Sequence, residues 1–175
     1  MQQVSYMQIK KEPYLFEDTK LLNIYESLDS DQKQICFTDR PDHHSIEDGT
    51  GSLFDYHPCN EMDWTELNPL FHNTYLEEIY NLISEEYVIG RSRFMVMDKT
   101  NRALSYHYDD GLRLHIPLQT NPHAWFINAE QELIRMDELG RLYSLDAKQY
   151  HSALNLDRNG TPRIHIVFSV EKKLK

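Results

Sequence analysis

The sequence is poor in cysteine and glycine, with two cysteines and six glycines among 175 residues. Cys36 and Cys59 are too few for the disulfide framework of a small secreted protein, and they lack C-x-x-C spacing. The sequence also has no glycine-rich phosphate loop and no G-x-S-x-G nucleophile motif. We therefore expect reduced thiols, a cytoplasmic location, and chemistry that uses neither of these motifs.

Long apolar runs and basic residues are scarce as well. No stretch approaches the ~20 apolar residues of a membrane span, and the N-terminus lacks the apolar core of a signal peptide. Lys and Arg number 18 against 28 Asp and Glu, which gives a formal net charge of −10. A surface of that sign repels phosphate backbones, so we expect neither nucleic-acid duplexes nor membranes as partners. The oligomeric state is left open.

The length of 175 residues suits a single domain, and the pattern of the sequence changes near Gly90. Residues 1–88 combine loops with helical patterns and are expected to support a sheet. Asn68 and Pro69 predict the start of a helix there, with one broad apolar face and one acidic face.

From Gly90 onward the apolar residues repeat with period two, which is typical of strands. Turn signals such as Asp110-Gly111 and Asn159-Gly160 separate the candidate strands. These strands are 91–97, 104–108, 112–118, 123–128, 131–136, 141–145, 149–154 and 162–170. Many short strands without helical crossovers predict a mainly β protein with flanking helices (α+β), as a sandwich, barrel or jelly roll.

An H-x-D motif, His107 and Asp109, lies among these strands. Alternate residues of a strand point to the same face, so the imidazole and the carboxylate can reach one point in space. His151 supplies a second imidazole farther along the chain. Two histidines and one carboxylate form the set that holds non-haem Fe(II) with open coordination positions.

Two strands repeat one pattern, Arg113-Leu-His-Ile and Arg163-Ile-His-Ile. In each, arginine and histidine share one face, and apolar residues take the other. Because the metal motif lies in the same half of the chain, we expect a polar cavity lined by cations. Alternatively, His115 and His165 are core histidines whose ring nitrogens are hydrogen-bonded within the protein. Trp125 is expected to pack in the sheet or to line the cavity.

Three stretches resemble the aspartyl/asparaginyl β-hydroxylase family of Fe(II)- and 2-oxoglutarate-dependent oxygenases. They are YHYD with RLHIPLQTNP (106–122), LGRLYSLD (139–146), and HSALN with PRIHIV (151–167). With residues 91–97 they cover about half the chain. The resemblance implies a double-stranded β-helix, that is, a cupin-like jelly-roll catalytic core over residues 89–171, with residues 1–88 as its support.

The resemblance also implies a role for individual residues. His107 and His151 would be iron ligands, and Arg163 would anchor the distal carboxylate of 2-oxoglutarate. Asp109, from the H-x-D motif, would complete a triad like that of other 2-oxoglutarate oxygenases. Arg113 and His115 would face the carboxylates of cosubstrate or substrate, with Tyr108 and Trp125 as further substrate contacts. The implied reaction uses O₂ to hydroxylate a C–H bond of a small amino acid-like or peptidyl substrate, with succinate and CO₂ as coproducts.

The sequence departs from the name-giving vertebrate enzymes in two places. Those enzymes have glycine where this chain has Asp109, and they use a serine on the preceding strand that residues 94–97 do not offer. A hydroxyl could come instead from one of four residues, Tyr106, Tyr108, Tyr143 or Ser144. Two other functions stay open: a non-catalytic cupin-like module that binds a metal or small anion, and a metal-dependent dioxygenase that does not use 2-oxoglutarate.

Overall fold

The computed structural model describes residues 8–52 and 59–174, and most of its strands form two antiparallel sheets. The larger sheet has the order β1-β10-β7-β12-β6-β2, and β5 pairs with β12. Its strands are β1 (Ile9–Leu15), β2 (Gln34–Cys36), β5 (Tyr87–Ile89), β6 (Arg93–Met97), β7 (Leu112–Gln119), β10 (Arg141–Asp146) and β12 (Arg163–Lys172). The smaller sheet, β11-β8-β9, contains β8 (Ala124–Ile127), β9 (Leu133–Ile134) and β11 (Ser152–Asn155). A short separate pair joins β3 (Thr38–Asp39) to β4 (Glu66–Leu67).

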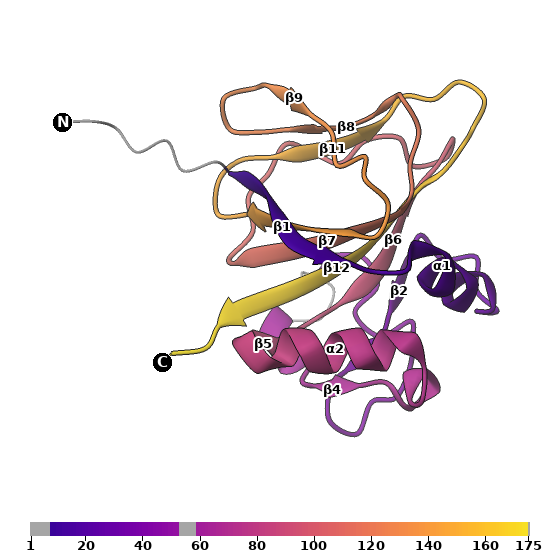
Figure 1. The fold of residues 1–175 in the computed structure, drawn as a ribbon, viewed down its shortest axis with the longest axis vertical. Coiled ribbons are helices and arrows are strands. Elements are labelled where there is room, and N and C mark those ends of the chain that lie inside the picture. The colour runs from indigo at the N-terminus through magenta and orange to yellow at the C-terminus, as the bar shows by residue number, and fades with distance from the viewer. Residues whose placement is uncertain (1–7, 53–58, 175) are drawn as a thin grey trace.

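The helices lie on the side of the larger sheet away from the smaller one (Figure 1). They are α1 (Asp18–Glu26) and α2 (Tyr75–Glu86), with 3₁₀ turns η2 (Glu61–Asp63) and η3 (Pro69–Phe71). The described part of the chain is thus mostly β-sheet with two α-helices, as predicted. None of its helices is long and apolar enough to cross a bilayer.

Each long strand of the larger sheet separates two environments. On β12, Ile164, Ile166 and Phe168 are buried in a core that also contains Leu76 and Ile79 of α2. This core is the apolar face predicted from the period-two pattern. The opposite face of the sheet meets the smaller sheet, where a second apolar cluster forms. Its members include Met97, Phe126, Leu145 and Ala153.

Several element boundaries differ from the prediction. The predicted strand 104–108 is wrong, because only isolated bridges at Ala103 and His107 connect this segment to β11 and its flank. The helix predicted from Asn68 begins at Tyr75. Asn68 does cap a turn, but only the short η3, and Asn73 with φ of 60° interrupts the helical path before α2.

The N-terminal part contributes to the sheet as well as supporting it. Strands β1 and β2 form the two ends of the hydrogen-bonded path through the larger sheet. Pro13 lies within β1, which pairs with β10 alone, so the missing amide hydrogen falls on an edge strand.

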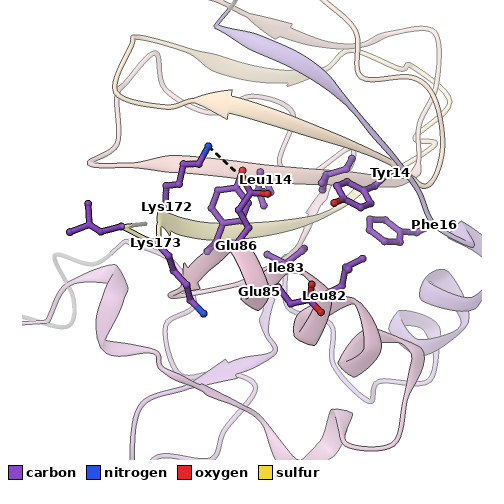
Figure 2. Close-up of a pocket in the computed structure, with 12 residues that line it drawn as sticks. Tyr14, Phe16, Leu82, Ile83, Glu85, Glu86, Leu114, Lys172 and Lys173 are labelled. Atoms are coloured by element: carbon purple, nitrogen blue, oxygen red, sulfur yellow. Dashed lines mark ion pairs between the residues drawn. The ribbon is translucent and has the colours of Figure 1, made fainter.

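A hollow of about 520 Å³ opens on the helix side of the larger sheet (Figure 2). Tyr14 and Phe16 lie at one end, and Lys172 pairs with Glu86 at 3.4 Å at the other. Leu114 and Ile83 form part of its lining. This hollow holds none of the residues that the sequence marks as a site.

Candidate metal centre and cavity

The structure brings His107, Asp109 and His151 together. One potential ligand atom from each lies within 4.8 Å of the others. The Nε2 atoms of the two histidines are 3.9 and 3.8 Å from the carboxylate oxygens of Asp109. This arrangement is suited to a single divalent metal ion held on one face and open on the other.

The backbone positions the two imidazoles opposite each other. His107 and His151 form an antiparallel bridge, in which each amide donates to the other's carbonyl at 3.0 and 2.8 Å. Their ring centroids are 4.6 Å apart. The Asp109 amide donates to the carbonyl of Ala147 at 2.8 Å, which fixes the H-x-D segment beyond the bridge. A single bridge, not a full strand, is thus enough to align the motif.

Backbone carbonyls select the tautomer of both histidines. Nδ1 of His107 lies 2.6 Å from the carbonyl of Ser105, and Nδ1 of His151 lies 3.0 Å from that of Gln149. A carbonyl can only accept, so each Nδ1 carries the hydrogen and each Nε2 presents a lone pair toward Asp109. Burial lowers the pKa of His151, which favours the neutral form that a metal requires.

A cavity of about 1040 Å³ adjoins the triad, between the two sheets. Cationic side chains from three strands and their flanks contribute to its wall, as predicted. They are Arg91, Arg93, Arg113 and Arg163, and the neutral ring of His115 lies in the same wall. All five residues are buried. Four guanidinium groups therefore line a cavity in a protein of net charge −10, together with the carboxylates of Glu61, Asp109, Asp110 and Glu171.

Arg163 is a buried cation without a counter-charge. No ion pair involves it within residues 8–52 and 59–174, and its residue is 4% exposed. Its guanidinium lies 4.9 Å from the ring centroid of Phe126 and donates to Nδ1 of His165 at 3.1 Å. Burial lowers its pKa to about 9. An isolated buried charge is costly, so this position is suited to a ligand carboxylate.

His115 offers unused hydrogen-bonding atoms in the same cavity. Neither ring nitrogen has a partner among the described residues. Its ring packs edge-on against Phe126, with 5.3 Å between centroids. Burial and the nearby Arg163 hold its pKa well below the ordinary value, so the ring is neutral and can both donate and accept. His165 lies deeper and has only its Nε2 unpartnered in the same set.

Arg113 lies at the triad, where the sequence placed it, but it is already paired. It contacts Asp109 at 3.3 Å and forms a closer pair with Glu61. Glu61 also binds Arg91 at 2.7 Å and lies 3.8 Å from Arg93. Burial alone would raise the pKa of Glu61, but the three guanidinium groups outweigh it and hold that pKa below its ordinary value.

Trp125 lies outside the cavity. On β8 its neighbours Ala124 and Phe126 are buried, and Phe126 takes the cavity position. Trp125 faces the other way, with the guanidinium of Arg135 5.6 Å from its ring centroid. Tyr108 does contribute to the cavity wall, at its exposed end.

Of the four hydroxyl-bearing residues considered for cosubstrate binding, Tyr108 alone is among the described lining residues. The Tyr106 hydroxyl donates to the carbonyl of Asn128, and the Tyr143 hydroxyl accepts from the amide of Glu138. Ser144 donates to Glu12. These three hydroxyls are therefore engaged elsewhere.

Sequence reasoning missed Glu61, Arg91 and Arg93 as parts of the cavity. Arg93 could have been found, because it lies within the predicted strand 91–97 in phase with Met95 and Met97, which also line the cavity. Glu61 had no such signal, since it lies in a 3₁₀ turn after a loop and reaches the cavity through tertiary packing.

No family model and no curated protein matches this sequence. Solved structures with a similar fold do exist. AviO1 from Streptomyces viridochromogenes Tue57 is 14% identical, with 94% of this chain and 90% of that chain covered and a TM-score of 0.54. ThoJ, described as a non-heme monooxygenase in complex with nickel, is 12% identical, with 94% and 74% covered and a TM-score of 0.53. At these identities the likeness concerns the fold alone.

Proposed function

We propose that this chain is an Fe(II)- and 2-oxoglutarate-dependent oxygenase that hydroxylates an unactivated C–H bond of a small amino acid-like or peptidyl substrate. We further propose that its two sheets form a jelly roll of the kind found in the aspartyl/asparaginyl β-hydroxylase family, which the sequence resembles. A non-heme monooxygenase has a similar fold, which favours this proposal by analogy.

The observation that carries the proposal is the isolated charge of Arg163 in the cavity that adjoins the triad. A buried, unpaired guanidinium destabilises the folded protein unless a ligand supplies its counter-charge. A carboxylate can pair with arginine through two parallel hydrogen bonds, which makes arginine well suited to the distal carboxylate of 2-oxoglutarate.

The donor set fits iron, and the neighbouring atoms fit the cosubstrate. His107, Asp109 and His151 would hold the metal, with Nε2 of each histidine free for it. The unpartnered nitrogens of His115 would bond an oxygen of 2-oxoglutarate or of substrate. Iron and 2-oxoglutarate supply the oxidising chemistry when bound, with succinate and CO₂ as coproducts. The chain's own part is to bind and orient the cosubstrate and substrate in the cavity and to exclude water from it.

The test is a titration of 2-oxoglutarate into protein that contains Mn(II) in place of iron, without oxygen. Arg163→Ala is expected to weaken binding about 30- to 5,000-fold, since loss of one partner of a buried charged pair costs ~2–5 kcal/mol. Arg163→Lys should lie between the two, because the charge remains but the planar fork is lost. Mn(II) affinity should be unchanged in both variants.

Arg135→Ala is the matched control, because it removes a guanidinium that stacks on Trp125 outside the cavity. Equal 2-oxoglutarate affinity in wild type and Arg163→Ala would exclude the cosubstrate role. Metal binding without 2-oxoglutarate binding would favour a metal-binding module or a dioxygenase of another kind. Substrate-stimulated release of succinate distinguishes the proposed enzyme from both.

A further inference from the structure

We propose that a part of the cavity beside the metal triad is a second anion site, which recognises a doubly negative group of the substrate. This site consists of Arg91, Arg93 and Arg113 around Glu61, and we call it the arginine cluster. The inference rests on the proposed function for its identification of the ligand as substrate. It goes further by naming the chemical class that the substrate must present.

The charges of the cavity divide into two groups. A divalent metal, one Asp109 carboxylate, the two carboxylates of 2-oxoglutarate and Arg163 together are neutral. The arginine cluster is not, because Glu61 neutralises one of its three guanidinium groups. Asp110 and Glu171 also border the cavity, but both are exposed and therefore screened by water. Among the residues that the structure describes, two buried positive charges are then left for an incoming anion.

The contacts within the cluster show which guanidinium groups are available. Arg91 is held by Glu61 and by the carbonyls of Gly49 and Gly51. Arg93 has weaker support, with one hydrogen bond to the side chain of Gln34 at 2.8 Å and Glu61 at 3.8 Å. Its Nε, like that of Arg91, has no partner among the described residues, and burial lowers the pKa of Arg93 to about 10. Arg93 therefore has the most to gain from a ligand anion.

Glu61 occupies the position between the arginines that a substrate anion would share. It is the more accessible partner, with a side chain 16% exposed against 5–8% for the three arginines. Because each Glu61 oxygen holds a different arginine, the carboxylate spaces the guanidinium groups and orients Arg113 beside Asp109. We assign Glu61 as a positioning residue that also competes with weakly bound anions.

A phosphate and a pair of neighbouring carboxylates share the chemistry that this site would bind. The probes are therefore inorganic phosphate and malonate, with acetate as the singly charged comparison. Each is titrated into the Mn(II) protein in the presence of saturating 2-oxoglutarate, so that the proposed cosubstrate site at Arg163 is filled. Phosphate or malonate is expected to bind more tightly than acetate, and the tighter of the two identifies the oxyanion.

Two variants should move the affinity in opposite directions. Arg93→Met is expected to weaken the dianion about tenfold to a hundredfold, since it removes one charged hydrogen-bonding partner. It should fold, because it replaces a poorly paired buried charge by an apolar chain. Glu61→Gln should tighten dianion binding, because the competing carboxylate is gone. Arg135→Gln, outside the cavity, should change nothing, and thermal melting checks that each variant is folded.

The same affinity for phosphate, malonate and acetate in wild type, Arg93→Met and Glu61→Gln would overturn the inference. In that case normal 2-oxoglutarate binding would leave the proposed function intact. Conversely, a dianion that binds metal-free protein and responds to Arg93→Met, while 2-oxoglutarate does not bind, would retain the anion site and reject the proposed function.

Discussion

The two faces of strand β12 have the same period and the same burial, but opposite chemistry. One face carries Ile164, Ile166 and Phe168, which pack against apolar side chains of the helical layer. The other carries Arg163 and His165, which are equally buried. Among the described residues, the charge of Arg163 has no counter-charge and Nε2 of His165 has no hydrogen-bond partner. Burial alone therefore does not separate core from site in this protein.

The difference lies in how well each buried group is compensated. Apolar groups gain free energy when they leave water, and they need no specific partner. Buried charges and hydrogen-bonding groups need one, and natural proteins leave few of them unsatisfied. On β12 and the adjacent β7, the unsatisfied atoms gather on the face toward the cavity, at His115, His165 and Ser169. These unsatisfied groups cost the folded state free energy that apolar side chains at the same positions would not.

The comparison predicts the largest loss of stability on the helix-facing side. Phe168 is fully buried and packs edge-on against Phe37, with 5.1 Å between ring centroids. Phe168→Ala should lower the free energy of unfolding by ~3–5 kcal/mol, because it removes apolar contacts and leaves a cavity. Urea denaturation of the metal-free protein measures this. A loss below ~1 kcal/mol would show that the helical layer contributes little to the fold.

On the cavity side, substitution of an equally buried residue should raise the free energy of unfolding instead of lowering it. Arg163→Met removes an unpaired buried charge and loses the hydrogen bonds to His165 and to the sulfur of Met97. The first effect exceeds the second, so the free energy of unfolding is expected to rise by roughly 1–3 kcal/mol. The same urea titration, without 2-oxoglutarate, provides the measurement. Destabilisation as large as that of Phe168→Ala would mean that Arg163 is a structural residue, and would weaken the case for a ligand carboxylate.

The features that the sequence could predict are local ones. Alternation along residues 163–170 reports which side chains share a face, so both faces of β12 could be assigned before the structure was known. The resemblance to a known family, together with H-x-D and His151, selected three residues that the structure brings within ligand distance. The predicted role of each stays a prediction until the ion is measured.

The features that the sequence could not predict depend either on tertiary contacts or on which of two adjacent strand residues faces the cavity. Glu61 belongs to a turn far from the strands in sequence, and its position in the arginine cluster follows from packing. Trp125 and Phe126 are adjacent aromatic residues, and only the phase of β8 decides which of them faces the cavity. Residues 104–108 alternate like a strand but have only isolated bridge partners.

The smallest expected effects come from two buried serines that differ in one hydrogen bond. Ser169 is on the cavity face of β12, and its hydroxyl has no partner within the described part of the chain. Ser152 of β11 is similarly buried, but its hydroxyl donates to the carbonyl of Leu104 at 2.8 Å. Both changes to alanine remove one hydroxyl oxygen. The difference between their effects on the free energy of unfolding therefore measures the contribution of the hydrogen bond that Ser152 makes and Ser169 lacks.

Ser169→Ala should leave the free energy of unfolding unchanged or raise it by up to ~1 kcal/mol, since an unpaired buried hydroxyl costs free energy in the folded state. Ser152→Ala should lower it by about 1 kcal/mol or more, because the carbonyl of Leu104 loses its donor. Parallel urea titrations of the two variants resolve a difference of that size. If Ser169→Ala is as destabilising as Ser152→Ala, its hydroxyl has a partner in solution, such as a bound water, and the contrast between the two faces of β12 is smaller than we infer.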